Sequence, residues 1–379
     1  MASKARRLSP ALVVFLAILC FIVGAAAGFL GAARNNFLAP VDEYAELNSH
    51  GKGGSIHTST EISGDLQIHF LELGNYYTGD CVYIKAGDTD VLIDAGSKTS
   101  SVPTISAYLD QYVTDNKLEY VIVTHAHEDH YAGFAAKNGI FDLYECGVII
   151  DFAQTNQKPT ATMYKNYIAN RDAEIAAGAT HYTALDCIEQ NKTDFELADG
   201  INMKILDSYY YANKDSSGEN NHSVCMLLTE GENNYLFTGD LEAKGEKKLV
   251  EMNDLPEVVL YKAGHHGSKT SSSTELLSVI KPQIVCVCCC AGSAEYTSTE
   301  NNKFPTQEFI DRVAPFTDRV YVTTIFESDE DKTFNSMNGN ITVCSDGEKI
   351  WVVCSASDLL LRETPWFEEK RTCPAAWQK

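Results

Sequence analysis

The sequence predicts an α/β protein in which layers of sheet and helix share a core. Short runs rich in Val, Ile and aromatic residues, such as residues 118–123 and 258–262, have the composition of buried strands. Segments predicted to be helical, such as residues 101–116 and 160–177, alternate with runs of this kind. The order strand, helix, strand is typical of layered α/β domains.

The amino terminus has the pattern of a membrane-targeting segment. Residues 11–30 form an apolar run without charge, about the length that crosses a bilayer core. Three basic residues precede the run and only Arg34 follows it closely, which by the positive-inside rule leaves the amino terminus in the cytoplasm. Residues 1–34 are therefore predicted to be a single transmembrane anchor, with the rest of the chain outside the cytoplasm. The alternative is a signal peptide cleaved near residues 25–27, which would make the protein secreted.

The remaining chain divides into three segments. Residues 35–65 have low hydrophobicity and a Gly-Lys-Gly-Gly stretch, and are interpreted as a linker. Strand-like runs begin at residue 66, and one large domain is predicted over residues 66–355. Residues 356–379 form a tail whose tryptophans either cover a sheet edge or leave the tail mobile.

The chain is strongly acidic, with a formal net charge of −22 from 30 basic and 52 acidic residues. Four of the basic residues and none of the acidic ones precede residue 35, so the remainder is more acidic still. Such a surface repels polyanions on average, which argues against tight non-specific DNA binding outside a local basic groove. Solubility is the simplest meaning of this charge.

The 12 cysteines do not resemble a disulfide framework. Cys286, Cys288, Cys289 and Cys290 lie in the apolar run 284–290, where cysteine acts as a small hydrophobic residue of a buried strand. A zinc–thiolate site is the less favoured alternative.

The first strands of the domain are predicted at residues 67–71, 81–85 and 91–94, the last two joined by a Gly-Asp turn. His69 alternates with apolar neighbours, and we predict that it lies on the strand surface and binds no metal. Further along, a short helix is predicted at residues 134–138.

The densest group of metal-ligand types follows the strand at residues 118–123. His125, His127, Asp129 and His130 fall within six residues, in the pattern H-x-H-x-D-H. The first two histidines share a side in an extended segment, so Asp129 and His130 can serve a second ion a few ångströms away. Nitrogen and carboxylate ligands together suit zinc, with manganese or iron as alternatives.

Two later strand ends carry further chemistry. Asp240 ends the segment Tyr-Leu-Phe-Thr-Gly-Asp, and His265 and His266 follow the strand at residues 258–262. Beyond them, Ser268 and Lys269 supply a hydroxyl and a cation suitable for a phosphate or another anion. The serine run after Lys269 also suits a helix N-cap, and the two roles are compatible.

These motifs resemble the metallo-β-lactamase superfamily, and in particular the metallo-β-lactamase-like domain of the ComEC family of DNA-uptake proteins and its stand-alone relatives. The combination of H-x-H-x-D-H, F-T-G-D and H-H-G-S-K-T-S is highly specific for the family and much less specific for the substrate. The matching segments are residues 66–97, 125–130, 220–242, 261–273 and 340–351. The resemblance implies a four-layer αββα sandwich, here preceded by one transmembrane helix instead of the many that a DNA channel needs.

The resemblance also implies the roles of the site residues. His125, His127 and Asp240 would hold one divalent ion, and Asp240 would bridge to a second one. The second ion would be held by Asp129, His130 and His266. His265 would face the substrate and protonate a leaving oxygen, although an exchange of roles between His265 and His266 remains open.

Aspartates at positions 80 and 94 would lie near the histidine motif, with Asp94 bracing the histidine loop by accepting hydrogen bonds. Ordinary turn chemistry is the alternative for Asp94.

The chain departs from the family pattern at two places. Most superfamily members have a third histidine for the first ion near residue 222, whereas the ComEC-like pattern is Asn-x-Ser. Here that pattern is Asn221-His222-Ser223, with His222 at the variable position, so we expect that His222 does not bind metal. Phe304 occupies a position at which relatives often have histidine, which weakens the prediction of nuclease activity.

The sequence thus predicts an extracytoplasmic hydrolase that uses two divalent ions, with zinc favoured, to activate water. Its predicted substrate is a phosphate diester, either nucleic acid such as DNA or a cell-wall substituent. One alternative is a surface binding module for DNA uptake or wall assembly that has lost turnover. Another is a different hydrolase of this superfamily, acting on a lactone, a thioester or a β-lactam.

Overall fold

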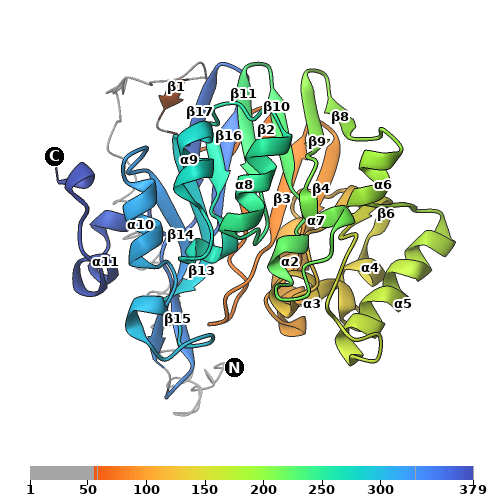
Figure 1. Ribbon diagram of the computed structural model, residues 1–379, viewed down its shortest axis with the longest axis horizontal. Coiled ribbons are helices and arrows are strands. Elements are labelled where there is room, and N and C mark those ends of the chain that lie inside the picture. Colours follow the sequence, from red (N-terminus) through yellow and green to blue (C-terminus); the bar gives the residue numbers. More distant parts are fainter. Residues whose placement is uncertain (1–54, 58, 329, 379) are drawn as a thin grey trace, which may run out of the picture. The chain divides into compact units, whose positions relative to one another are not determined.

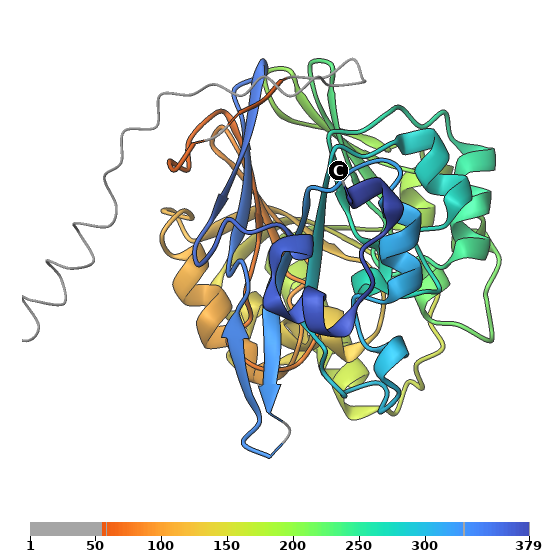
Figure 2. The ribbon, with the colours of Figure 1, turned by 90° about the vertical axis from the view of Figure 1, so that its left-hand side faces the viewer.

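In the computed structural model, two β-sheets stack face to face and helices cover their outer faces (Figures 1 and 2). The structure describes residues 55–57, 59–328 and 330–378. The predicted membrane segment and most of the predicted linker lie outside these residues. Within them, no helix is long and apolar enough to span a bilayer.

The first sheet has the strand order β1-β17-β16-β2-β3-β4-β5-β6-β7. Its strands are β1 (Ser55–His57), β2 (Leu66–Phe70), β3 (Val82–Ala86), β4 (Thr89–Ile93), β5 (Lys117–Val123), β6 (Glu145–Asp151), β7 (Thr180–Thr183), β16 (Ile341–Ser345) and β17 (Lys349–Cys354). Strands β4 to β7 run parallel to one another, whereas β2, β3 and β16 form antiparallel pairs.

The second sheet has the order β15-β14-β13-β12-β11-β10-β9-β8. Its strands are β8 (Asp194–Ala198), β9 (Ile201–Ile205), β10 (Met226–Glu230), β11 (Asn233–Phe237), β12 (Leu260–Lys262), β13 (Ile284–Ala291), β14 (Val320–Ser328) and β15 (Thr333–Ser336). Strands β11 to β14 are parallel, so the carboxyl ends of this group lie at one edge.

Three apolar clusters hold these layers together. One lies between the sheets and joins side chains such as Ile84 and Ile122 to Leu228 and Phe237. The other two lie between each sheet and its helices. The helices on the first sheet are α2 (Val102–Leu109), α3 (Glu128–Ala135), α4 (Ile140–Leu143) and α5 (Thr162–Ala177). Those on the second sheet are α8 (Ala243–Met252), α9 (Thr274–Ile280), α10 (Gln307–Val313) and α11 (Pro365–Lys370).

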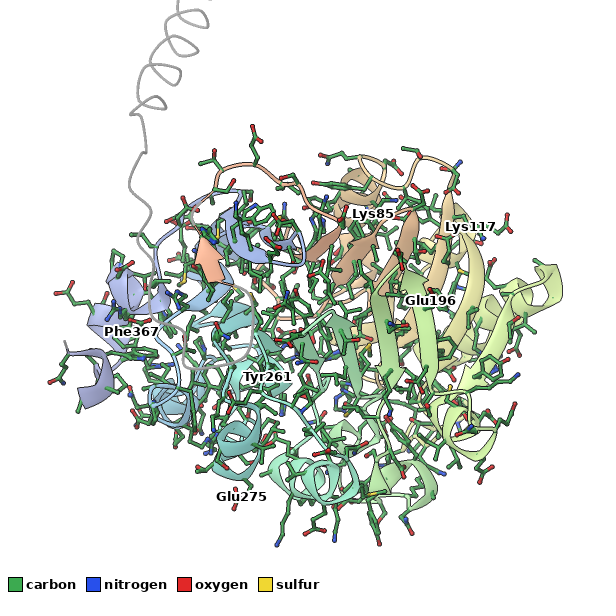
Figure 3. The ribbon with its side chains drawn as sticks, turned by 90° about the horizontal axis from the view of Figure 1, so that it is seen from above. Lys85, Lys117, Glu196, Tyr261, Glu275 and Phe367 are labelled. Carbon is green, nitrogen blue, oxygen red and sulfur yellow. The ribbon has the colours of Figure 1, made fainter. Side chains whose placement is uncertain are left out.

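This arrangement is a mixed α/β sandwich consistent with the metallo-β-lactamase fold, as the sequence predicted. Strand β13, which contains the cysteine run, is buried over its whole length, because it lies between the inter-sheet cluster and the helices above. Of the two short helices, α6 (Ala184–Glu189) precedes β8 in the chain and α7 (Tyr209–Ala212) follows β9. Figure 3 shows the contrast between Tyr261, inside the body, and Glu275, which projects from α9 at the surface.

Several local predictions were wrong. His69 is fully buried, because α2 and the following turn cover its face of the sheet with Tyr108 and Tyr112. Burial lowers the pKa of His69 to about 3, so the ring is neutral. The helix expected at residues 134–138 instead begins at Glu128, inside the histidine motif, and the helix expected at residues 101–116 ends at Leu109.

The ends of the described chain also join the body. Residues 55–57, assigned from composition to the linker, form β1 and pair in parallel with β17. In the tail, Trp366, Phe367 and Trp377 are buried in the cluster above the second sheet. Arg371 donates from Nε to the carbonyl of Pro305 at 2.9 Å, so the tail also holds the loop before α10. The tail therefore packs on the helical side of the second sheet.

Candidate metal centre

The predicted ligands come together at one edge of the sandwich because each follows a strand. The histidine motif follows β5, Asp94 follows β4, Asp240 follows β11, and His265 and His266 follow β12. Parallel strands present their carboxyl ends at a common edge, and loops there can converge on one site. Asp80 reaches the same edge because it precedes β3, which is antiparallel to β4.

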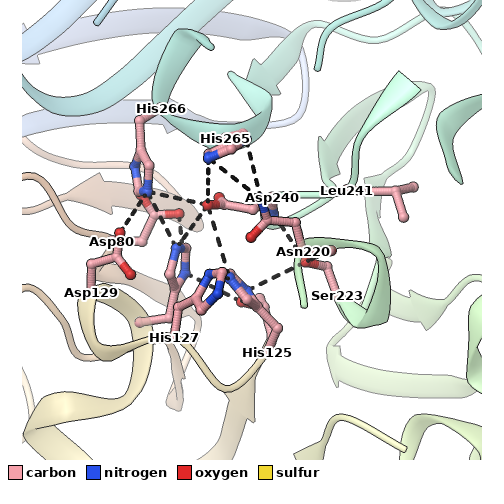
Figure 4. Close-up of polar contacts among 12 residues, drawn as sticks. Asp80, His125, His127, Asp129, Asn220, Ser223, Asp240, Leu241, His265 and His266 are labelled. Atoms are coloured by element: carbon pink, nitrogen blue, oxygen red, sulfur yellow. Dashed lines mark hydrogen bonds and ion pairs between the residues drawn. The ribbon is translucent and has the colours of Figure 1, made fainter. Parts of the chain in front are cut away.

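Asp240 is the centre of the site (Figure 4). Its Oδ2 atom lies 3.2 Å from His130 Nε2 and 3.3 Å from His266 Nε2. The Nε2 atoms of His125 and His265 lie farther away, at 4.0 and 3.9 Å. Asp240 is 1% exposed, and its Oδ1 atom has no hydrogen-bond partner among the described residues. A buried carboxylate oxygen without a donor fits a cation better than it fits water.

Near this carboxylate, two pairs of histidines have ring nitrogens that face each other. His125 Nε2 lies 3.0 Å from His127 Nδ1, and His130 Nε2 lies 3.3 Å from His266 Nε2. Two imidazole nitrogens that face each other need a proton or a cation between them. Imidazole nitrogen is a good ligand for zinc and for other transition metals. The donor set therefore fits a divalent metal ion. Four ligand atoms lie within 4.8 Å of one another, one each from Asp80, His130, Asp240 and His266.

His130 is fixed from behind by Asp94, as predicted from the family. The Nδ1 atom of His130 lies 2.7 Å from Asp94 Oδ2, and Asp94 also accepts hydrogen bonds from the amide and hydroxyl of Thr124. A carboxylate bonded to one ring nitrogen directs the other nitrogen toward the centre. Although burial disfavours a charged ring, the carboxylates of Asp240, Asp94 and Asp80 raise the pKa of His130.

Asp80 is paired with a buried lysine. The Nζ atom of Lys262 lies 2.5 Å from Asp80 Oδ2, and both residues are almost completely buried. Asp80 Oδ1 also lies 3.2 Å from His266 Nδ1. Lys262 thus adds a fixed positive charge behind the candidate metal ligands. No motif in the sequence marks Lys262, although a lysine that ends an apolar strand just before two histidines is an unusual local feature.

The two adjacent histidines differ in burial. His266 is buried, and its Nδ1 lies 2.9 Å from the Cys288 carbonyl. His265 has a side chain that is 20% exposed, and its Nδ1 lies 3.0 Å from Thr270 Oγ1. Both residues have left-handed backbone, with φ of 47° and 55°, which turns the two rings in different directions. This geometry favours His266 as the ligand. His265 then lies on the solvent-exposed side of the metal centre, which is called the mouth of the site below.

Ser223 contacts His125 at Nδ1, the ring nitrogen that does not face His127. Its Oγ lies 3.4 Å from His125 Nδ1 and accepts a hydrogen bond from the amide of Asp240. Gly239 makes this contact possible, because a Cβ there would lie 2.8 Å from Ser223 Oγ. His222 points elsewhere: its Nε2 accepts the amide hydrogen of Asp215 at 3.0 Å.

Replacing His222 with alanine is therefore expected to leave the metal content unchanged. The ring supports the loop at Asp215, so a loss of stability of about 1–3 kcal/mol is expected from the unpaired amide. Metal analysis by mass spectrometry and a thermal melt of the variant test this. Loss of one ion would show that the first site has a third histidine.

The loop after His266 is held by a buried glutamate. Glu246 on α8 accepts hydrogen bonds from the amides of Ser272 and Ser273 at 2.6 and 2.7 Å. Ser273 also caps α9, as the serine run suggested. Within the loop, Ser268 is buried, whereas Lys269 is exposed and donates to Asn302 Oδ1 at 2.8 Å. Lys269 forms no ion pair with any described residue, so no acidic side chain neutralises its charge.

Glu246 makes the stability of the fold pH-dependent. Burial raises its pKa from 4.5 to about 7, against the serine hydrogen bonds that lower it. The folded protein then binds this proton more tightly than the unfolded chain, so the stabilisation is complete below about pH 4.5 and is lost as the pH rises through about 7.

We expect the wild type to lose about 3 kcal/mol of unfolding free energy over this range relative to Glu246→Gln. Urea denaturation of both chelated proteins at several pH values tests this. Parallel pH profiles of the two proteins would contradict it.

Two aromatic residues at the mouth were not assigned catalytic roles by the sequence. Tyr296 donates its phenolic hydrogen to Asp129 Oδ2 at 2.6 Å. Its hydroxyl is shielded from water and lies beside that carboxylate, so its pKa is raised and the phenol keeps its proton. Phe304 lies with its ring centroid 5.7 Å from that of His265 and 5.8 Å from that of Tyr296. No motif marks Tyr296, because it lies in a polar loop 167 residues from Asp129 in the sequence.

A mixed α/β sandwich with a histidine and aspartate cluster at its strand ends is the architecture of a metallo-β-lactamase-type protein. In agreement, residues 74–136 match the family described as the metallo-beta-lactamase superfamily. It also resembles competence proteins of the ComEC type, as predicted from its motifs.

Recombination protein 2 of Haemophilus influenzae is 36% identical over 88 residues, which are 23% of this chain and 10% of that protein. Competence protein ComA of Neisseria gonorrhoeae is 27% identical over 241 residues, 62% of this chain and 28% of that protein. The chain thus spans less than a third of the length of either relative. Among solved structures, the metallo-beta-lactamase fold protein YhfI of Bacillus subtilis aligns with 69% of this chain and 97% of its own, at 11% identity and a TM-score of 0.42.

Proposed function

We propose that this protein is a metal-dependent hydrolase of phosphate diesters. The observation that carries the proposal is the pair of facing histidine couples around the buried Asp240 carboxylate. His125, His127 and Asp240 would hold one divalent ion, and Asp129, His130, His266 and Asp240 would hold a second. Zinc suits these ligands, with manganese or iron as alternatives.

The bound ions would supply a water of lowered pKa and positive charge for the phosphoryl oxygens. The chain itself supplies the remaining contacts. Lys269, which is exposed and has no anionic partner among the described residues, would attract the phosphate and offset developing charge, and Ser268 would support it. His265 lies at the mouth with Nε2 toward the centre, where it can hydrogen-bond a leaving oxygen.

The substrate would be nucleic acid, including DNA, or a phosphodiester of the cell wall. The similarity to competence proteins supports the first, whereas the acidic composition favours a short or locally bound substrate over a tightly bound polyanion. We place this activity outside the cytoplasm at the cell membrane, through the apolar segment at residues 11–30. Secretion after cleavage of that segment is the alternative.

A binding module without turnover is the second candidate. The observation that favours it is at His222, which bonds Asp215 and so leaves the first ion without the third histidine ligand that most superfamily members have. Such a module would bind nucleic acid or a wall polymer at the same edge of the sandwich. It differs from the hydrolase in one respect only, the absence of turnover in the metal-loaded protein.

The assay that separates the two uses full-length protein in detergent, treated with chelator and reloaded with zinc, manganese or iron. We expect bis-p-nitrophenyl phosphate to be hydrolysed by at least one loaded form and not by the chelated protein. A β-lactam and a lactone, tested alongside, should be poorer substrates. Protein that takes up two equivalents of metal and hydrolyses no diester would refute the hydrolase and support the binding module.

A further inference from the structure

Tyr296 combines two features that are unusual together. Its hydroxyl lies 2.6 Å from a buried carboxylate of the candidate metal centre, yet 52% of the residue is exposed. The side chain therefore extends from solvent into the mouth of the site, with its polar end innermost. A structural tyrosine that only filled the core would not leave half of its surface in water.

The loop that carries Tyr296 is held in place on both sides. The neighbouring Glu295 accepts a hydrogen bond from the amide of Thr78 at 2.9 Å and pairs with Lys98 at 3.2 Å. Farther along the loop, the carbonyl of Phe304 accepts a hydrogen bond from the amide of Gly292 at 2.9 Å. The position of the phenol is thus fixed by contacts on two other segments, and does not depend only on its bond to Asp129.

The bond to Asp129 competes with the proposed metal. Asp129 Oδ2 lies 2.6 Å from the Tyr296 hydroxyl and 3.3 Å from His266 Nε2. An ion shared by Asp129 and His266 would draw on the same oxygen and weaken its bond to the phenol. The phenol would then lie beside the ion with a hydrogen-bond donor free for whatever oxygen binds there.

We propose that Tyr296 contacts the substrate and donates a hydrogen bond to a non-bridging oxygen of its phosphate group. This inference rests on the proposed function, because it takes a phosphate ester as the substrate of the same site. The ring, together with that of Phe304, forms an aromatic side of the mouth next to the bound group. The rival role for Tyr296 is to hold Asp129 in position for the metal.

The test measures binding and does not depend on turnover. Inorganic phosphate is titrated by calorimetry into metal-saturated, full-length wild type, Tyr296→Phe and the control Tyr76→Phe. Tyr76 is a second partly exposed tyrosine, whose hydroxyl donates to that of Tyr77 at 2.6 Å. Metal affinity of each protein is measured separately by competition with a chromogenic chelator.

We expect Tyr296→Phe to weaken phosphate binding about tenfold or more, the usual effect of losing a hydrogen bond to a charged group. Its metal affinity should change less than about twofold, and Tyr76→Phe should match the wild type in both. Unchanged phosphate affinity in Tyr296→Phe, or a wild type that binds no phosphate, would overturn the contact. If the metal affinity falls and the phosphate affinity does not, the role of Tyr296 is to hold Asp129, and the proposed contact with phosphate is also overturned. If the wild type binds phosphate but cleaves no diester, the proposed hydrolysis is refuted. The contact between Tyr296 and phosphate is then still tested by the phosphate and metal affinities of Tyr296→Phe.

Discussion

Replacing Asp240 with asparagine is expected to release at least one bound ion and to abolish hydrolysis. The carboxylate lies among four histidines, and its Oδ2 is within 3.3 Å of the ring nitrogens of His130 and His266. Two divalent cations held close together repel each other, and a bridging anion offsets that repulsion. Asparagine keeps the size of the side chain and removes its charge and one strong ligand oxygen.

The fold should survive this change, because β11 is held by core packing and the amide of residue 240 keeps its bond to Ser223. Metal content, diester turnover and circular dichroism are compared with those of Asp142→Asn, an exposed aspartate on α4. The control should match the wild type. An Asp240→Asn protein that retained two ions and a near-normal rate would show that the site is assigned wrongly.

Replacing Lys262 with methionine is expected to destabilise the protein by about 3–5 kcal/mol, because it leaves the buried Asp80 carboxylate without its cation. The two groups lie 2.5 Å apart and are 2% and 1% exposed. Breaking a buried ion pair from one side costs far more than removing both partners, since a single charge is then left in a poor solvent.

The double variant Lys262→Met with Asp80→Asn should therefore regain much of the lost stability. Urea denaturation of chelated wild type, the single variant and the double variant measures this, with the ions absent so that metal binding does not contribute. Equal stability of Lys262→Met and the wild type would mean that the pair contributes little, and a double variant no more stable than the single would mean that packing dominates.

The parts of the site that were predicted share a simple cause. The histidine motif places four ligand types within six residues, and Asp240 and His266 each follow an apolar strand, so the sequence alone indicates that they meet at one sheet edge. The layered α/β fold was predictable for the same reason, from the alternation of strands and helices. The family pattern predicted that His222 would not be a ligand, and its bond to Asp215 agrees with this.

What the sequence did not reveal depends on contacts between distant segments. The Lys262–Asp80 pair and the Tyr296–Asp129 bond join residues that only the folded sheets bring together. His69 was wrongly predicted to be at the surface. Alternation shows which face of the sheet a side chain is on, but it does not show whether a helix covers that face. The helix boundary at Glu128 was missed because the metal motif itself forms its first turn, where charged and polar residues hide the helical pattern.

The most direct test of two ions bridged by Asp240 is anomalous diffraction from crystals of the metal-loaded protein, recorded at the absorption edge of the bound metal. We predict two peaks, one at about 2.0–2.2 Å from nitrogens of His125 and His127 and one at a similar distance from ligand atoms of Asp129, His130 and His266, both in reach of Asp240. A single peak, or a peak coordinated by Asp80 or His222 instead of Asp240, would contradict the two-ion centre on which the proposed hydrolysis depends.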